Sequence, residues 1–143
     1  MDTITKEKRS WVMSRVKSQD TKPELLVRST LHRMGYRFRL HRNDLPGKPD
    51  IVLPKYHAVI FVHGCFWHRH TCKNGIRLPA SHQEYWIQKF KANLNRDKIS
   101  QALLENQGWH VLIIWECEVK SGIFYAKIEE FFYRIKLGIP TKD

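Results

Sequence analysis

Five consecutive apolar residues, Ala58-Val59-Ile60-Phe61-Val62, constrain the fold more than any other feature of this sequence. Apolar residues on both faces of an extended segment are typical of a strand in the middle of a sheet, with other elements covering each face. The run therefore predicts a central strand. It leads directly into the segment from His63 to Cys72, where histidines and cysteines are densest.

The region before this strand predicts one helix, one strand and half of a hairpin. Thr21 and Glu24 fit a capping box, Gly35 stands where a helix would end, and the helix between them has an apolar stripe. Apolar and basic residues alternate from Tyr36 to His41, which indicates a strand with a basic outer face. A turn with two prolines then leads to Asp50 and a short apolar strand that ends at Pro54. The predicted helical stripe comprises Leu25, Leu26, Val27, Leu31 and Met34.

The region after the central strand predicts a long helix, a strand and a final helix. Ser81 and Glu84 fit a second capping box, and the helical pattern stops near Gly108. A strand from Trp109 to Trp115 follows and ends at Glu116-Cys117. The last helix is amphipathic and closes on Gly138 and Pro140. The apolar residues of the long helix are Tyr85, Ile87, Phe90, Leu94, Ile99, Leu103 and Leu104, and those of the last helix are Phe124, Ile128, Phe131, Phe132 and Ile135.

The length and the charge indicate a single domain with a polyanionic partner. A chain of 143 residues can form one core, so we expect one domain over residues 1–143, with residues 1–20 as a basic N-terminal arm. The 25 Lys and Arg against 14 Asp and Glu give a net charge of +11, which favours nucleic acid over a membrane surface. The polar N-terminus and the lack of a long apolar run predict a cytoplasmic protein without a membrane partner.

The three cysteines indicate a metal site. Their odd number argues against a disulfide framework in a reducing compartment. Cys65, Cys72 and Cys117, with one histidine of the loop, could form a closed tetrahedral zinc site of three thiolates and one imidazole. Two alternatives stay open at this point: Cys117 could be an ordinary buried thiol, and either His68 or His70 could be the fourth ligand.

Asp50 and the end of the central strand form a candidate magnesium site. The two ends of a hairpin approach each other, here Asp50 and the strand end at Val62-His63, and a carboxylate with a backbone carbonyl is a common half-site for magnesium. Asp50 could instead be only a turn residue, and Glu24 is already explained as a helix cap. A histidine held beside a metal-bound loop, such as His68, suits general acid or base catalysis near neutral pH.

Two large aromatic residues, Phe66 and Trp67, lie in the same polar loop. They could be core residues, since most aromatic side chains are buried. Next to a basic surface they could instead be wedges that enter a stack of bases, joined by Trp86 of the following helix. The sequence pattern leaves both possibilities open.

Three motifs resemble those of the very short patch repair endonucleases, the Vsr family. They are Leu45-Pro-Gly-Lys-Pro-Asp50, Val62-His-Gly-Cys-Phe-Trp-His-Arg-His-Thr-Cys72 and Trp115-Glu-Cys117, and the match spans roughly Arg9 to Cys117. The resemblance implies a restriction-endonuclease-like α/β fold of the PD-(D/E)XK type, with a central mixed sheet flanked by helices and a structural zinc site. It also implies mismatch repair activity: a magnesium-dependent single-strand nick 5′ to the thymine of a T·G mismatch in double-stranded DNA.

The resemblance also implies roles for individual residues. Asp50 and the Val62 carbonyl would bind Mg²⁺, and His68 would be the catalytic histidine. His63, Glu24 and Asp97 would organise metal-bound water. The zinc ligands would be Cys65, His70, Cys72 and Cys117. The residues that contact DNA would be the wedge, Phe66, Trp67 and Trp86, and Met13 from the minor-groove side.

The sequence departs from the family pattern at a few positions. Family members often have threonine at the position of Val62 and histidine at those of Arg69 and Thr71. The Glu-x-Lys element usual in nucleases of this fold is absent, because Phe61-Val62-His63 occupies its place. Two other functions remain as alternatives, a zinc-dependent hydrolase and a zinc-stapled DNA-binding module without catalysis. We expect a monomer, with accessory repair proteins as further partners.

Overall fold

The computed structural model describes residues 20–73 and 75–141. Met13 and nearly all of the expected N-terminal arm lie outside the described residues. In chain order the elements are α2 (Lys22–Arg33), β1 (Arg39–Leu40), β2 (Ile51–Leu53), the short 3-10 helix η1 (Pro54–Tyr56), β3 (Ala58–His63), α3 (Gln83–Asn106), β4 (His110–Trp115), α4 (Glu116–Ser121) and α5 (Phe124–Leu137). Within the described part of the chain, every helix is too short or too polar to cross a membrane.

The four strands form one mixed sheet in the order β1-β2-β3-β4. β1 pairs with β2 and β2 with β3 in antiparallel fashion, whereas β3 and β4 are parallel, from Ala58 opposite His110 to His63 opposite Trp115. β3 is a central strand as predicted, and every residue in it except Val62 is buried. The chain therefore has the predicted α/β architecture.

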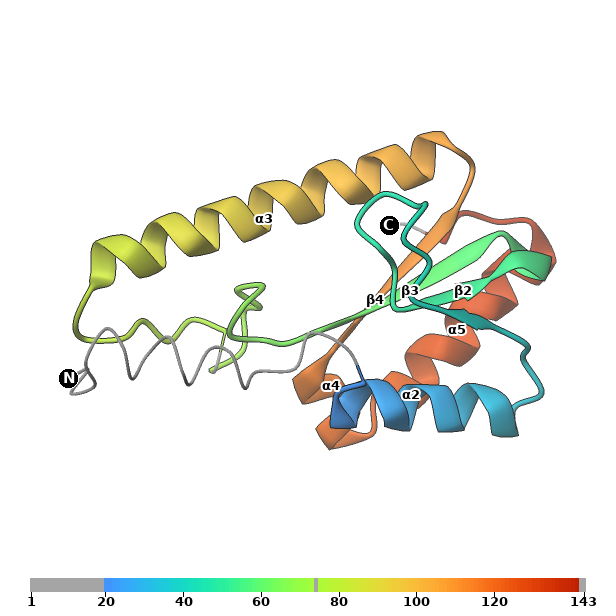
Figure 1. The fold of residues 1–143 in the computed structure, drawn as a ribbon. Coiled ribbons are helices and arrows are strands. Elements are labelled where there is room, and N and C mark those ends of the chain that lie inside the picture. The colour runs from blue at the N-terminus through green and yellow to red at the C-terminus, as the bar shows by residue number, and fades with distance from the viewer. Residues whose placement is uncertain (1–19, 74, 142–143) are drawn as a thin grey trace.

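Helices cover both faces of the sheet, with α3 on one side and α2, α4 and α5 on the other (Figure 1). Side chains alternate along each strand, so each strand contributes to both layers. Ala58 and Ile60 belong to the larger cluster, beneath α2 and α5, while Val59 and Phe61 pack toward Leu104 of α3. The larger cluster also contains Val27, Leu31, Ile51, Leu53, Ile114, Val119, Ile128, Phe131 and Phe132.

The predicted helix α2 is confirmed, but its buried stripe is narrower than predicted. The capping box forms: the Glu24 amide donates to Thr21 Oγ1, and the Thr21 amide donates to the Glu24 carboxylate, each over 3.4 Å. Val27 and Leu31 are fully buried, whereas Leu25 is 49% exposed and Leu26 46%. The prediction was wrong for these two leucines because only one side of the helix lies against the sheet.

The strand expected from Tyr36 to His41 is shorter in the structure. Only Arg39 and Leu40 pair, with Val52 and Ile51, because β2 itself has only three residues. Tyr36 instead stacks on Phe132 with ring centroids 4.0 Å apart. Its ring packs against the larger core cluster, although Tyr36 does not pair with β2.

α3 is confirmed as a long helix, but its start and its buried face differ from the prediction. It begins at Gln83 after His82, which has a φ of +56° and no capping hydrogen bond from its side chain, so the expected capping box of Ser81 and Glu84 does not form. Of the predicted apolar residues, Phe90 and Leu104 are buried, whereas Tyr85, Ile87, Leu94, Ile99 and Leu103 are 45–52% exposed. Trp86, Asn93 and Ser100 complete the buried face.

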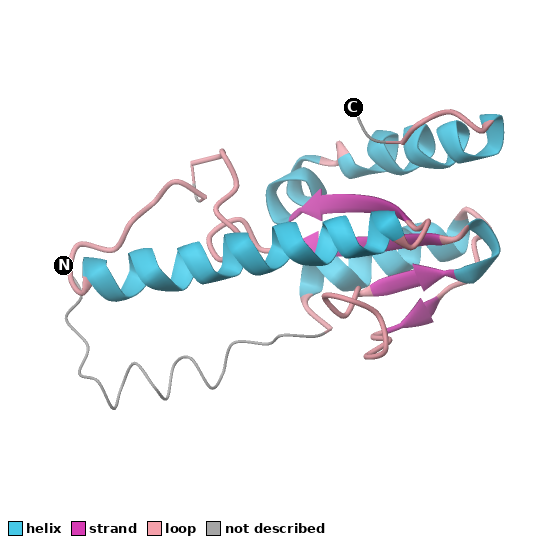
Figure 2. Ribbon diagram, turned by 90° about the horizontal axis from the view of Figure 1, so that it is seen from above, coloured by secondary structure: helices cyan, strands magenta, loops and turns pink. Residues whose placement is uncertain are grey.

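The position of α3 explains this buried face. Figure 2 shows α3 over the sheet at its C-terminal end and extending well beyond the sheet at its N-terminal end. In that outer half the helix lies over the loop between β3 and α3, as Figure 1 also shows. The sheet therefore covers only part of the helix. Leu104 packs toward the sheet, whereas Trp86 and Phe90 contact Phe66 of the loop.

The C-terminal segment contains a helix that the sequence patterns did not predict. The strand was expected to end at Glu116-Cys117, but β4 ends at Trp115, and α4 begins at Glu116. Glu118, three residues after Trp115, accepts the Trp115 amide over 2.8 Å and caps the helix. The last helix, α5, is confirmed, with Ile128, Phe131 and Phe132 buried and its end at Gly138, which has a φ of +70°.

Candidate active site and metal centres

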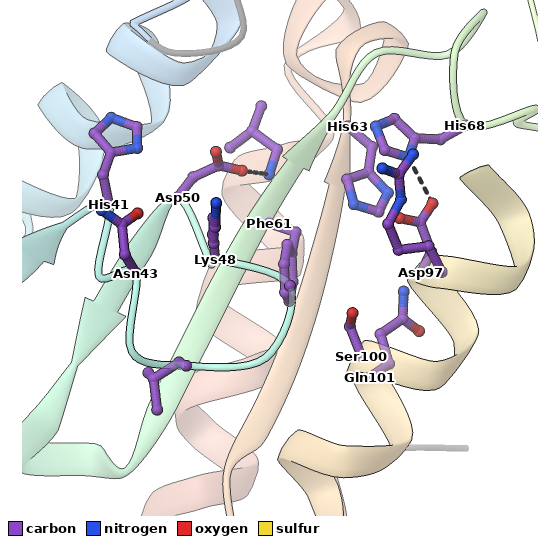
Figure 3. Close-up of a pocket in the computed structure, with 14 residues that line it drawn as sticks. His41, Asn43, Lys48, Asp50, Phe61, His63, His68, Asp97, Ser100 and Gln101 are labelled. Carbon is purple, nitrogen blue, oxygen red and sulfur yellow. Dashed lines mark hydrogen bonds and ion pairs between the residues drawn. The ribbon is translucent and has the colours of Figure 1, made fainter. Parts of the chain in front are cut away.

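A cavity of about 850 Å³ lies between the turn before β2, the end of β3 and the middle of α3. Asp50 reaches it from the turn, Val62 and His63 from β3, His68 from the loop after β3, and Asp97 from α3 (Figure 3). The fold thus brings together five residues that the sequence analysis named as candidates for catalysis.

Asp50 and Val62 meet as the hairpin prediction required. The Val62 amide donates to Asp50 Oδ2 over 2.7 Å. In an extended strand the N–H and C=O of one residue point to the same side, so the Val62 carbonyl also faces the Asp50 side. Continued pairing from Ile51 opposite Ile60 would place Pro49 across from Val62, and proline has no N–H to donate. A carboxylate and a backbone carbonyl therefore converge there, and both are hard oxygen ligands of the kind that Mg²⁺ prefers.

The surroundings of Asp50 disfavour its charge in the absence of a cation. Burial raises the pKa of the Asp50 carboxyl to about 6, and the negative charge of Glu24 adds to the effect. The hydrogen bond from the Val62 amide opposes it. A bound cation would compensate the buried carboxylate, so the donor set fits a metal site.

Two histidines and one carboxylate form a second constellation in the same cavity. His68 Nδ1 lies 2.5 Å from Asp97 Oδ2, and the His63 and His68 rings stack with centroids 3.8 Å apart. The contact with Asp97 favours the His68 tautomer with hydrogen on Nδ1, which leaves Nε2 as a proton acceptor. His63 is 5% exposed, and burial lowers its pKa to about 3, so this ring is neutral at physiological pH.

Glu24 is both a helix cap and part of a charged network behind the cavity. Its carboxylate lies 3.0 Å from Arg28 and 3.2 Å from His41 Nε2, and the residue is 2% exposed. His41 lines the cavity, whereas Glu24 does not. Glu24 therefore contacts the candidate active site through His41, which the sequence analysis placed in a strand but did not identify as a site residue.

Cys65, His70, Cys72 and Cys117 form the candidate zinc cluster. One potential ligand atom from each of the four lies within 4.8 Å of the others. The parallel pairing of β3 with β4 makes this possible, because it places the loop after His63 beside the chain that follows Trp115. His68 interacts with Asp97 and does not belong to this cluster, so the structure groups His70 with the cysteines.

Two of the three thiols of this cluster, those of Cys65 and Cys117, are held protonated when no cation is bound. Burial raises the pKa of Cys65 to about 12 and also raises that of Cys117. Zinc binds thiolates, and its charge would reverse this shift. Three soft sulfur donors and one imidazole at this spacing fit a closed tetrahedral zinc site.

The aromatic residues of the loop are neither core nor fully exposed. Phe66 and Trp67 are half-buried, with ring centroids 5.1 Å apart, and Trp86 lies behind them at 5.7 Å from Phe66 and 5.8 Å from Trp67. Phe66 and Trp67 line a second cavity of about 670 Å³, which shares Val62, His63 and His68 with the first. The rings therefore lie directly beside the candidate catalytic histidine.

Comparison with known proteins decides the family. Residues 1–74 match the family model described as DNA mismatch endonuclease Vsr. The chain belongs to the Vsr family. It is 52% identical over 128 residues to the type II nicking enzyme V.XorIIP of Xanthomonas oryzae, and the aligned segment covers 89% of this chain and 93% of that protein. It is 40% identical over 120 residues to the DNA mismatch endonuclease Vsr of Escherichia coli, and the aligned segment covers 84% of this chain and 76% of the relative.

Membership in the Vsr family confirms the resemblance drawn from the three motifs and makes the chain a DNA endonuclease, a hydrolase of phosphodiester bonds.

The sequence patterns missed several polar residues that line the candidate active-site cavity of this Vsr-family protein. Besides His41 they include Lys48 and Arg96. Lys48 belongs to a motif that was singled out for Asp50, and Arg96 immediately precedes Asp97. Neither residue has a spacing that marks it, because each reaches the cavity through the way its element packs.

Proposed function

We propose that this protein makes a magnesium-dependent single-strand nick 5′ to the thymine of a T·G mismatch in duplex DNA. The observation that carries the proposal is the convergence of two constellations in one cavity: Asp50 with the backbone of Val62, and His68 with Asp97. The names of the relatives, a nicking enzyme and a mismatch endonuclease, support the proposed reaction. The four-stranded mixed sheet agrees with a restriction-endonuclease-like fold.

In this proposal Asp50 and the Val62 carbonyl hold Mg²⁺, which would supply positive charge to the oxygens of the scissile phosphate. His68 Nε2 accepts a proton from the attacking water as its oxygen bonds to phosphorus and a P–O ester bond breaks. Asp97 keeps the His68 ring oriented and stabilises the imidazolium that forms. His63 stays neutral and holds the plane of His68 by stacking.

The zinc in this proposal is structural. The four ligands Cys65, His70, Cys72 and Cys117 would leave no open coordination position, whereas a catalytic zinc keeps one for water. The metal would fasten the loop after β3 to the start of α4. Since Phe66, Trp67 and His68 lie between two of the ligands, the same staple would hold the wedge and the catalytic histidine together.

The aromatic wedge of Phe66, Trp67 and Trp86 explains how a mismatch would be recognised beside the proposed catalytic residues. Aromatic side chains that enter a base stack act most easily where pairing is already weak. Phe66 and Trp67 are accessible from the second cavity, and Trp86 supports them from α3. Met13, outside the described residues, would contact the same step from the minor groove.

The test is a nicking assay with zinc-loaded protein on duplexes that each carry one T·G mismatch within randomised flanking bases. Matched duplexes with T·A at the same position serve as controls, and sequencing locates each nick. We expect a nick 5′ to the mismatched thymine only when magnesium is added. A nick without added magnesium would favour a zinc-dependent hydrolase, and tight binding without any nick would favour a DNA-binding module.

A further inference from the structure

The active-site cavity contains a lysine to which the proposed chemistry assigns no task. Lys48 lies two residues before Asp50 and lines the same cavity. Figure 3 shows its side chain extending from the turn into the cavity, at the same end as Asp50. Among the residues that the structure describes, no carboxylate makes an ion pair with Lys48. The ammonium group is therefore free to bind an anion from outside the protein.

The strand beside Lys48 supplies no cation of its own. Its last residues, Phe61, Val62 and His63, are two apolar side chains and a buried imidazole that stays neutral. On the opposite wall Arg96 also lines the cavity, and its guanidinium is hydrogen-bonded to the neutral side chain of Asn93. A phosphate in the cavity would thus lie between a cation from the turn and a cation from α3.

The backbone at Lys48 is strained, and the turn around it is tightly held. Lys48 has a φ of +48°, in the left-handed region where a residue with a Cβ costs free energy, and its amide donates to the Leu45 carbonyl over 3.1 Å. The preceding Gly47 has a φ of +74°, and a Cβ on it would lie 2.7 Å from Ser100 Cβ of α3. The following Pro49 is buried. The turn therefore fixes the direction in which the Lys48 side chain leaves the backbone, beside the cavity that it lines.

The residue type at position 48 is not the one that the backbone favours. Glycine adopts this conformation without strain, and asparagine with less strain than lysine. Strained residues that persist despite such a cost cluster at functional sites. The cost is explained if the position needs the ammonium group of the side chain.

From this geometry we propose that Lys48 is a further catalytic residue, whose ammonium group binds a non-bridging oxygen of the scissile phosphate. The contact exists when DNA binds and strengthens as negative charge grows on the phosphate oxygens during attack. Lysine, with three donors on a flexible stem, suits a phosphate whose charge changes during the reaction. The inference rests on the proposed nicking function, because the scissile phosphate must lie in this cavity.

Three variants of Lys48 and one matched control test the inference. Lys48→Met removes the charge, Lys48→Gly removes the charge and also the backbone strain, and Lys48→Arg keeps the charge. Lys55→Met removes the same charge from an exposed lysine in η1, at the opposite end of the β2–β3 hairpin. Each protein is measured for its melting temperature, for the salt dependence of its binding to a T·G duplex, and for its single-turnover nicking rate.

Loss of one phosphate contact should make the slope of log K against log salt less negative by about 0.9 in Lys48→Met and Lys48→Gly. Nicking by both variants should fall about 100-fold or more, as when one preorganised donor to a transition state is removed. Lys48→Arg should keep the slope and most of the rate, and Lys55→Met should match the wild type. Lys48→Gly should melt no lower than the wild type, because glycine relieves the strain, so its loss of activity could not come from unfolding.

A salt slope for Lys48→Gly and Lys48→Met equal to that of Lys55→Met would overturn the inference, whatever their nicking rates. Failure of Lys48→Arg to restore either property would overturn it as well. If the wild type nicks no T·G duplex, the proposed function fails, and the salt slope still decides whether Lys48 binds a phosphate. If the wild type nicks and the Lys48 variants nick equally well, only the inference fails.

Discussion

Replacement of Asp50 by asparagine should stabilise this protein in the absence of magnesium while abolishing nicking. The side chain is partly buried, and its carboxylate accepts a hydrogen bond from the Val62 amide. An asparagine carbonyl oxygen can accept the same hydrogen bond without carrying a charge. The substitution thus removes a buried charge and keeps the local geometry.

The size of the effect follows from the pKa of Asp50, which burial raises from 3.8 to about 6. Because the folded state holds this proton more tightly than the unfolded state, the free energy of unfolding falls as pH rises through the window from about 4 to about 6. At about 1.4 kcal/mol per pKa unit, the charged carboxylate costs up to roughly 3 kcal/mol above that window. For a chain of this size each kcal/mol corresponds to about 3–4 °C, so Asp50→Asn should melt several degrees higher near pH 7.5.

The assay is thermal denaturation of zinc-loaded wild type and Asp50→Asn between pH 4 and 8, in buffer without magnesium or chelator. The difference in melting temperature should be largest above pH 6 and vanish near pH 4. The low pKa of His63 makes stability fall as pH drops below about 6.5, but both proteins carry this histidine, so its effect cancels. Added magnesium should raise the melting temperature of the wild type only.

A matched control is Asp44→Asn, which removes an exposed carboxylate paired with Arg42. The arginine lowers the pKa of Asp44, so this variant should show no gain in stability at any pH. If Asp50→Asn were less stable than the wild type at pH 7.5 without magnesium, the hydrogen bond to the charged carboxylate would outweigh its burial. The reasoning that makes this position a cation site would then be wrong.

Three other variants test the remaining parts of the site. His68→Ala should lower the nicking rate by about 10²–10⁴-fold with normal zinc content; a wild-type rate would exclude His68 as the proton acceptor. Cys117→Ser should lose zinc and melting temperature together, since structural zinc can contribute on the order of 10 kcal/mol to folding; full zinc content measured by metal analysis would remove Cys117 from the cluster. Simultaneous Phe66→Ala and Trp67→Ala should weaken binding to a T·G duplex by about 1–3 kcal/mol per lost stack, with little effect on binding to matched duplex. A collapse in stability with normal mismatch binding by the folded fraction would instead make these rings core residues.

Local patterns in the sequence were sufficient to predict most of the helices and strands. The capping box of Thr21 and Glu24 and the doubly apolar run from Ala58 to Val62 each act over a few residues, so their consequences can be derived without the fold. The same reasoning failed at the start of α3. There a plausible capping box of Ser81 and Glu84 gave way to a left-handed His82, because the preceding loop sets the direction in which the chain enters the helix.

The buried face of α3 could be predicted only at Phe90 and Leu104, because burial depends on what covers a helix. A search for apolar periodicity selected Ile87, Leu94 and Leu103, which are about half exposed. The true buried face includes Asn93 and Ser100, since it lies over the loop and the cavity. A helix that borders an active site carries polar residues on its inner side. A search for apolar periodicity cannot identify those residues as part of the buried face.

The sequence by itself determined the α/β class, the family and the residue types of both candidate metal sites, because motifs such as Val62 to Cys72 keep their chemistry within a short stretch. Only the tertiary structure decided which residues meet. The parallel pairing of β3 with β4 brings Cys117 to Cys65, and the packing of α3 brings Asp97 to His68. It also placed Lys48 in the cavity, through a turn clamped against Ser100. These contacts join residues that are far apart in the chain, and their geometry comes from the packing of whole elements, which no local pattern encodes.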